Sequence, residues 1–295
     1  MKAPQTVNGR SGPDPAETSD ESLNSDRVKA LQDFEDLKLE LWEERGYARL
    51  TLDRPETRNA MRLTTLEEYI EALDYCESRR DVRCLILTGA GDRVLSSGGD
   101  LKDELKFTEQ PEKLEAFVRR GAEFIARLLG SRLPVIAAVN GPVYGAMVSM
   151  VAACDLAISV EKAVFAVPTV SLGGIPGWGC TQLLTRTLGL RAAKRLVLGN
   201  QVLDSAEALR IGLVDELCPP DQLKPRAEAL AEQLAFYPPT ILAAIKKTMI
   251  EGLDRTLHQA LELESRTLLQ HNRSGNFREG IAAFLEKRPA RFDYA

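Results

Sequence analysis

Apolar residues in this chain fall into short runs that end at glycine-containing turns, a pattern typical of buried strands. The run Pro134–Val139 is too short and too closely bounded for a surface helix, so it predicts a strand buried on both faces. Cys84–Thr88 has the same character, and Tyr47–Leu52 alternates between apolar and polar positions. Further short strands are predicted at Leu156–Ser159, Val164–Val167 and Leu213–Leu217. Buried strands separated by helices indicate an α/β fold.

Helical patterns occupy the segments between these strands. The segment GAMVSMVAACD, which begins at Gly145, is apolar on every side and predicts a helix buried in the interior. Two capping-box patterns, Thr64 with Glu67 and Asp204 with Glu207, predict two further helix starts. Other helices are predicted at Glu112–Leu129, Thr181–Leu188 and Ala192–Leu198, and Gly212 is expected to end the helix that Asp204 opens. Between Val28 and Leu41 the apolar positions drift between periods, which suggests a short lead-in helix followed by a strand.

The chain divides into three parts by composition. Residues 1–25 are rich in Pro, Ser, Asp, Asn and Gly and have almost no large apolar residue, so we expect a disordered tail. Residues 26–220 hold strand–helix units that recur without a detectable sequence repeat. Residues 221–295 read as three or four helices, broken at Pro238-Pro239 and around Ser274-Gly275.

Two glycine-rich turns bring backbone N–H groups into the predicted interior. The turn Ser96–Asp100 leads into a helix that Asp100 is expected to cap, and Gly145-Ala146 open the buried helix. The first turn of a helix leaves N–H groups without intrahelical partners, and its dipole adds partial positive charge there. Two such N–H groups aimed at one oxygen form an oxyanion hole, which stabilises charge that develops on an ester or thioester carbonyl.

The longer motifs around these turns resemble a known family. SSGGDL, AAVNGPVYGAMVSMVAACDLAIS, FAVPTVSLGGIPGWGCTQLLTRTLG and EGIAAFLEKR follow one another in this order, and RPETRNA precedes them at Arg54–Ala60. From Phe34 to Phe292 the chain resembles the enoyl-CoA hydratase/isomerase (crotonase) superfamily. The resemblance implies a spiral of ββα units followed by a helical C-terminal region that builds a homotrimer, commonly paired into a hexamer. It also implies an acyl-CoA substrate, with coenzyme A as part of the thioester and no separate cofactor.

Carried over position by position, the resemblance places the two oxyanion donors on the backbone N–H groups of Gly99 and Ala146. The two catalytic glutamates of well-studied hydratases fall on Ser149 and Thr169 in this chain. The glycine-rich turn Gly177–Cys180, where related enzymes carry acids, holds no Asp or Glu either. Hydration by two glutamates is therefore not expected, although Ser149 and Thr169 keep their places as candidate catalytic residues.

Three functions stay open for such a site. An oxyanion hole without a strong base suits a decarboxylase or C–C lyase, because the substrate then generates its own carbanion. An atypical enoyl-CoA hydratase or isomerase is the alternative, with an acid recruited from elsewhere, such as Glu264 or Asp103. The third possibility is a catalytically silent CoA-binding subunit.

The resemblance also assigns residues to substrate binding. The acyl pocket is expected to be lined by Tyr144, Met147, Trp178 and Cys180. Cys180 is either a nucleophile near a helix start or a buried inert thiol, and Ser149 either orients water or bonds back to its own helix. The residues expected to hold coenzyme A are Arg54, Arg58, Ser96, Gly98 and Lys102, with Lys287 reaching over from a neighbouring subunit.

Composition and charge exclude several classes of binding partner and cellular location. The net charge of −5 is spread along the chain, which leaves no basic footprint for nucleic acid or an anionic membrane. No apolar run reaches the roughly 18 residues that span a bilayer, and no signal or transit pattern opens the chain, so we expect a cytoplasmic protein. The 5 scattered cysteines indicate reduced thiols, and with only His258 and His271 and no CxxC pair no metal site is expected.

Overall fold

The computed structural model describes residues 28–30 and 34–294, so the predicted tail at residues 1–25 lies outside the described residues. Within the described part, seven strands form one sheet in the order β1-β2-β3-β4-β5-β7-β10. Its strands are β1 (Val28–Ala30), β2 (Leu37–Trp42), β3 (Tyr47–Leu52), β4 (Cys84–Gly89), β5 (Val135–Val139), β7 (Leu156–Val160) and β10 (Glu216–Cys218). The pairs from β3 to β10 are parallel, and the residues of β5 are all buried, as expected for strands covered on both faces.

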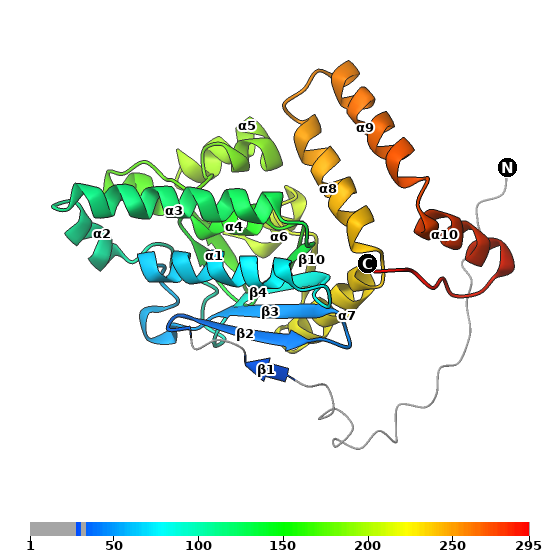
Figure 1. Cartoon of the computed structure of the whole chain (residues 1–295). Coiled ribbons are helices and arrows are strands. Elements are labelled where there is room, and N and C mark those ends of the chain that lie inside the picture. Colours follow the sequence, from blue (N-terminus) through cyan, green and yellow to red (C-terminus); the bar gives the residue numbers. More distant parts are fainter. Residues whose placement is uncertain (1–27, 31–33, 295) are drawn as a thin grey trace.

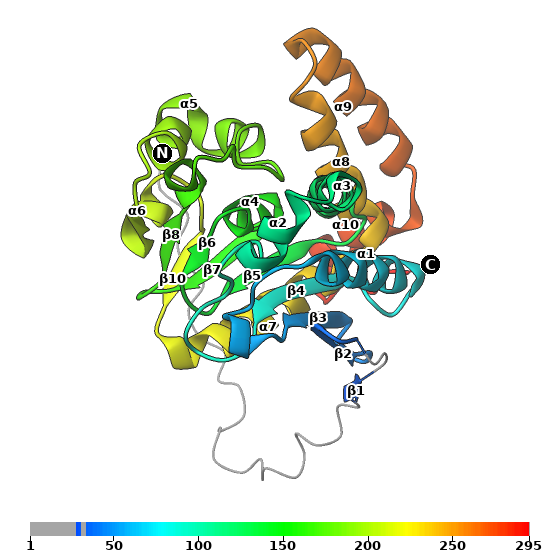
Figure 2. The same ribbon diagram turned by 90° about the vertical axis from the view of Figure 1, so that its left-hand side faces the viewer.

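Helices cover both faces of this sheet. On one face α1 (Leu63–Ser78) packs against α3 (Pro111–Gly130), with the rings of Tyr69 and Phe124 at 4.6 Å between centroids. On the other face lies α7 (Leu223–Ala235), which Figure 2 shows below the strands. The short helix α4 (Met147–Ala153) packs between α3 and α5 (Leu183–Val197). The core therefore lies between the sheet and the α1–α3–α4 layer.

A smaller sheet stands beside this core. It contains β6 (Val143–Tyr144), β8 (Val164–Ala166) and β9 (Leu203–Asp204), and β6 pairs with β8 in parallel. The remaining core helices are α2 (Leu101–Phe107) and α6 (Ser205–Arg210), with the 3-10 turns η2 (Pro55–Thr57), η3 (Pro168–Leu172) and η4 (Pro220–Gln222). Strand β6 lies directly before α4, so this small sheet sets where α4 begins.

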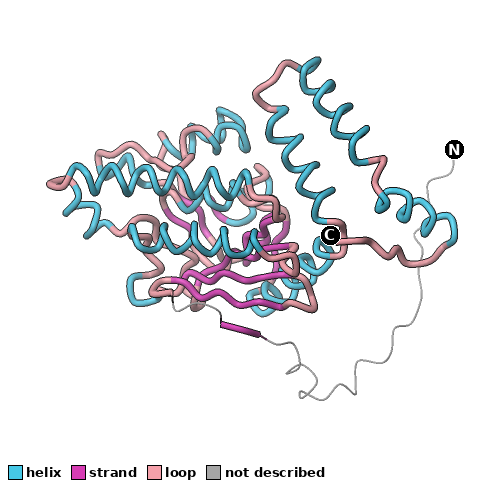
Figure 3. The backbone as a smooth tube through the Cα atoms, viewed as in Figure 1, coloured by secondary structure: helices cyan, strands magenta, loops and turns pink. Residues whose placement is uncertain are grey.

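The C-terminal helices extend away from the sheet (Figures 1 and 3). They are α8 (Pro239–Gly252), α9 (Leu257–His271) and α10 (Gly275–Glu286), and they confirm the predicted helical region. Lys246 anchors α8 to the core, because its Nζ donates to Asp155 Oδ2 at 2.7 Å and to the carbonyl of Leu128 at 3.0 Å. In the part of the chain that the structure describes, no helix combines the length and the apolar character needed to span a membrane.

The α/β prediction is confirmed, and three local predictions are wrong. The lead-in helix is instead strand β1, which pairs antiparallel with β2, so tertiary pairing decided a segment of ambiguous period. Helix α1 begins at Leu63, because the Arg62 N–H donates to Thr65 Oγ1 at 3.2 Å and this, rather than Thr64, marks the helix start. The last strand lies at Glu216–Cys218, where it pairs with β7. The cap at Asp204 is confirmed, since its Oδ1 accepts from the Glu207 N–H at 2.7 Å.

Candidate active site

The two glycine-rich turns singled out in the sequence touch each other. The Tyr144 N–H donates to the Ser96 carbonyl at 3.0 Å, which joins the turn after β4 to strand β6. Gly98 has φ +92°, and a Cβ atom placed on it would lie 3.1 Å from the Tyr144 carbonyl oxygen and 3.5 Å from Gly145 Cα. Glycine is therefore required at Gly98 both by the backbone angle and by the close approach of the second turn.

Next to this contact lie two N–H groups without partners. Among the described residues, the N–H groups of Gly99 and Ala146 form no hydrogen bond with the protein, whereas the N–H of Gly98 donates to Ser96 Oγ and that of Gly145 to the Ala166 carbonyl. Gly99 and Ala146 are both partly exposed. Two accessible donors in touching turns are what an oxyanion hole needs. Because α2 and α4 have only 7 residues each, single N–H groups rather than a long helix dipole carry this property.

Ser149, at the position of the first family glutamate, faces the interior. Its side chain is fully buried, and its Oγ lies 2.6 Å from both the Ala146 and the Trp178 carbonyl oxygens. A hydroxyl has one proton, so it donates to one of these oxygens at a time. Ser149 thus links α4 to the turn that carries Trp178. Its contact with the Ala146 carbonyl is the bond back to its own helix that the sequence allowed. Thr169, at the second glutamate position, lies partly exposed on η3.

Three of the four residues predicted to line the acyl pocket belong to the buried core, namely Met147, Trp178 and Cys180. Met147 and Cys180 have no exposed surface, because α4 and the Gly177–Cys180 turn pack directly on each other. Burial raises the pKa of the Cys180 thiol to about 11, although hydrogen bonds with Ser149 act in the opposite direction. The thiol is therefore protonated at neutral pH, which is the buried inert form. Tyr144 remains partly exposed.

Trp178 forms an aromatic cluster with Phe107 and Phe117. Its backbone has φ +49°, and its indole occupies the space that a side chain on Gly121 of α3 would fill. The rings of Trp178 and Phe117 meet edge to face at 4.9 Å, and Phe107 lies 5.8 Å from Phe117. A Cβ on Gly99 would lie 3.6 Å from Phe117 Cζ, so the aromatic cluster begins beside the unpaired N–H of Gly99.

A carboxylate that the sequence analysis did not select also lies beside Gly99. A methyl group on Gly99 would overlap Oε1 of Glu104, which stands on the first turn of α2. In the described residues this carboxylate has no hydrogen bond and no ion pair, and burial, together with the charge of Asp100, raises its pKa. The signal was present in the sequence, because helical side chains lean toward the N-terminus and Glu104 follows the cap residue by one turn.

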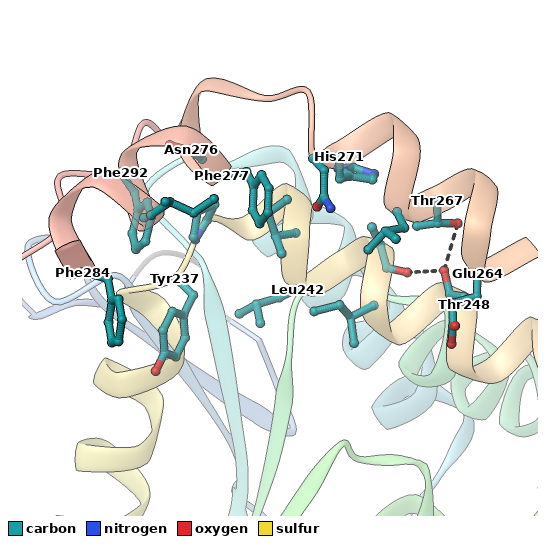
Figure 4. Close-up of a pocket in the computed structure, with 18 of the residues that line it drawn as sticks. Tyr237, Leu242, Thr248, Glu264, Thr267, His271, Asn276, Phe277, Phe284 and Phe292 are labelled. Carbon is teal, nitrogen blue, oxygen red and sulfur yellow. Dashed lines mark hydrogen bonds between the residues drawn. The ribbon is translucent and has the colours of Figure 1, made fainter.

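The two acids named from the sequence lie elsewhere. Asp103 forms an ion pair with Lys106 at 2.9 Å. Glu264 lines an apolar groove of about 780 Å³ between α8, α9 and α10, shown in Figure 4, where Thr248 donates to Thr267 at 3.2 Å. That groove belongs to the C-terminal helices and contains neither Gly99 nor Ala146.

The residues predicted to hold coenzyme A are only partly brought together. The Ser97 N–H donates to the Arg58 carbonyl at 3.0 Å, so the η2 turn adjoins the turn that contains Ser96 and Gly98. Ser96 and Gly98 themselves are buried. Arg54 is buried and paired with Asp36 at 3.2 Å and with Asp100 at 3.5 Å, which makes it part of the core. In contrast, Arg58 and Lys102 are exposed. Lys287 follows α10, at the opposite end of the molecule from α2 in Figure 1.

Comparisons with known proteins identify the family of this chain. The model of the enoyl-CoA hydratase/isomerase family matches residues 43–294. A protein described as a putative enoyl-CoA hydratase/isomerase, YngF of Bacillus subtilis, is 35% identical over 244 residues, which cover 82% of this chain and 93% of the relative. The short-chain-enoyl-CoA hydratase of Clostridium acetobutylicum is 33% identical over 81% of this chain and 91% of its own. The crystal structure of enoyl-CoA hydratase from Bacillus anthracis has a TM-score of 0.83 at 28% identity, covering 88% of this chain and all of the other.

Proposed function

The chain belongs to the enoyl-CoA hydratase/isomerase family, and from this premise we propose that it holds the thioester carbonyl of an acyl-CoA between the N–H groups of Gly99 and Ala146. Negative charge that moves onto the carbonyl oxygen during reaction is then stabilised as an enolate. The observation that carries the proposal is the pair of accessible, unpartnered N–H groups in two touching turns. The aromatic cluster of Phe107, Phe117 and Trp178 supplies an apolar wall for the acyl group.

For the reaction itself, we propose cleavage of a C–C bond at the α-carbon, such as decarboxylation of a malonyl-type thioester. Serine and threonine at the glutamate positions Ser149 and Thr169 do not act as strong bases at neutral pH, and the hydroxyl of Ser149 is already engaged with backbone carbonyls. Cleavage delivers the enolate without prior removal of a proton. Thr169, partly exposed on η3, remains available to contact the substrate.

A second candidate is hydration or isomerisation of an enoyl-CoA by an acid outside the two family positions. The carboxylate of Glu104 beside Gly99 favours it, and several relatives are named as enoyl-CoA hydratases. This reaction needs a proton at the α-carbon and a water activated near the β-carbon. One carboxylate that gives a proton and takes one back serves both needs.

The adenosine and phosphate portion of coenzyme A is proposed to lie along the η2 turn and the start of α2. Exposed Arg58 and Lys102 are the cations that suit this place, with backbone around Ser96 and Gly98 against the adenine. Lys287 would have to come from a neighbouring copy, since it follows α10, which lies on the opposite side of the molecule from α2 (Figure 1).

We also propose that the protein assembles as a homotrimer or as a hexamer of two trimers. The apolar side chains exposed on α8, α9 and α10 include Ile245, Met249, Leu268, Phe277, Ile281 and Phe284. A continuous apolar surface of this kind marks an interaction site in most proteins. Light scattering is expected to give three or six times the mass of one chain, and a monomeric mass would contradict the proposal.

The experiment that tests the reaction is mass-spectrometric turnover of malonyl-type, enoyl, β-hydroxyacyl and β-ketoacyl-CoA thioesters. Gly99→Pro serves as the control, because proline removes the N–H donor, which has no protein partner among the described residues to lose. Loss of CO2 that disappears in Gly99→Pro supports cleavage, and addition of water to an enoyl ester supports the second candidate. Binding of CoA esters without turnover would instead identify a silent binding subunit. Turnover that survives in folded Gly99→Pro would contradict the oxyanion hole.

A further inference from the structure

Any reaction that passes through the proposed enolate must move a proton to or from the α-carbon. The residues at the family's glutamate positions are poorly suited to this step. Ser149 is buried with its hydroxyl committed to backbone carbonyls, and Thr169 has an alcohol rather than a carboxyl group. Cys180 has no exposed surface. A carboxylic acid close to Gly99 would suit this proton transfer better than any of these three groups.

Glu104 meets this requirement by position. It is the fourth residue of α2, one turn beyond the cap residue Asp100, so its side chain leans back over the start of the helix. Its Oε1 lies where a methyl group on Gly99 would stand, beside the donor proposed to hold the carbonyl oxygen. The α-carbon of a thioester is bonded to the carbonyl carbon, so a carbonyl held at Gly99 brings the α-carbon within reach of the same carboxylate.

The environment of Glu104 is unusual for a structural carboxylate. Its neighbours on the same helix are engaged, since Asp103 pairs with Lys106 and Asp100 pairs with Arg54. Glu104 itself is half-buried, and within the described chain its carboxylate forms neither an ion pair nor a hydrogen bond. Burial and the charge of Asp100 favour its protonated form. Unpaired, partly buried carboxylates cost folding stability and are concentrated at functional sites.

We propose that Glu104 is the catalytic acid of this site and transfers the proton at the α-carbon of the enolate. This inference rests on the proposed oxyanion hole at Gly99 and Ala146. In decarboxylation, the bond between the α-carbon and the carboxylate breaks, CO2 leaves, and the electron pair of that bond enters the enolate. The O–H bond of Glu104 then breaks as a C–H bond forms at the α-carbon, and the solvent returns a proton to the carboxylate. In hydration, the hydroxyl of water bonds to the β-carbon as the C=C π bond breaks, the O–H bond of Glu104 breaks to form the C–H bond at the α-carbon, and the proton that the water loses returns to the Glu104 carboxylate.

Three substitutions separate the carboxylate from the N–H donor. Glu104→Gln keeps the shape of the side chain and removes the acid. Gly99→Ala keeps the N–H donor, and its new methyl group displaces the Glu104 carboxylate; the backbone of Gly99 is not left-handed, so alanine is tolerated there. Glu109→Gln is the matched control, because this glutamate is exposed in the turn just after α2.

The readout is deuterium incorporation at the α-carbon of butyryl-CoA in D2O, followed by mass spectrometry, together with the Kd for the same ester by calorimetry. We expect Glu104→Gln and Gly99→Ala to slow the exchange by about 100-fold or more, the scale of general acid–base catalysis, with Kd changed less than about twofold. Glu109→Gln should exchange at the wild-type rate. Glu104→Asp should recover part of the rate, which a merely structural side chain would not predict.

Thermal unfolding provides an independent measurement. Because the pKa of Glu104 is raised in the folded state, ionisation at neutral pH costs stability, and the cost grows as the pH rises above the ordinary pKa of glutamate. Glu104→Gln should therefore unfold at the same or a higher temperature than the wild type while losing exchange. Exchange at the wild-type rate in Glu104→Gln would overturn the role of Glu104. If exchange is lost in Gly99→Pro while Glu104→Gln retains it, the oxyanion hole stands and only the role of Glu104 fails. Absence of both exchange and turnover in the wild type would overturn both.

Discussion

Gly98 is the position at which a single methyl group should separate the two turns of the site. Its φ of +92° lies in the left-handed region, where alanine costs about 1–2 kcal/mol. The added Cβ would lie 3.1 Å from the Tyr144 carbonyl oxygen, which is closer than ordinary van der Waals contact, and 3.4 Å from its carbon. The backbone of Tyr144 has little freedom to move away, because its N–H is bonded to the Ser96 carbonyl and its strand pairs with β8. We expect Gly98→Ala to lower the free energy of unfolding by about 1–3 kcal/mol.

Catalysis should suffer more than stability. Gly99 directly follows Gly98, and Ala146 directly follows Gly145, so a shift of a few tenths of an ångström at Gly98 moves one N–H donor away from the other. Loss of one oxyanion donor costs about 10²–10³ in rate, and a partial displacement is expected to cost about 10–100-fold in kcat/KM. The assay pairs urea denaturation with kcat/KM for the CoA thioester that the substrate panel identifies.

Gly91→Ala is the matched control for this substitution. Gly91 has φ +78°, and nothing lies within 4 Å of a Cβ placed there, so alanine at Gly91 carries the backbone cost without the steric one. It should lose about 1 kcal/mol and keep full activity. Equal destabilisation of the two variants, with kcat/KM of Gly98→Ala unchanged, would refute the view that contact between the turns positions the donors.

Three further predictions concern groups around the site. Burial alone would raise the pKa of Asp36, but hydrogen bonds from Arg62 and others hold it below its ordinary value of about 3.8. The ionised Asp36 carboxylate therefore stabilises the fold fully above that pH, and this stabilisation is lost as the pH falls through the lower folded-state pKa. Asp36→Asn should lower the free energy of unfolding by about 3–5 kcal/mol in urea titrations at pH 7 and should flatten its dependence on acid pH. Ser149→Ala should cost about 1–3 kcal/mol, because the Trp178 carbonyl loses its donor, and an unchanged unfolding midpoint would contradict the bond. Cys180, with a pKa of about 11, should resist iodoacetamide at pH 7 in the native state and react after denaturation, as peptide mass spectrometry would reveal.

The backbone part of the site was predictable, because it depends on features that a sequence displays directly. The start of a helix leaves N–H groups without intrahelical partners, and the order of motifs placed Gly99 and Ala146 in one family pattern. The side-chain part was not predictable in the same way. Glu104 stands in the run LKDELKF, which reads as an ordinary solvated helix face until Phe117 and Gly99 are seen against it.

The sequence by itself determined the elements whose pattern is local. Strand β3 has the bounds that apolar periodicity predicted, β5 lies within the predicted run Pro134–Val139, and the cap at Asp204 formed as its spacing indicated. Only the tertiary structure decided which side chains face the interior. The exposure of a side chain is a sum over contacts from segments far apart in the chain, as when the indole of Trp178 fills the space left by Gly121. That same packing engages the hydroxyl of Ser149 with the Trp178 carbonyl and leaves Glu104 as the carboxylate beside the unpaired N–H of Gly99.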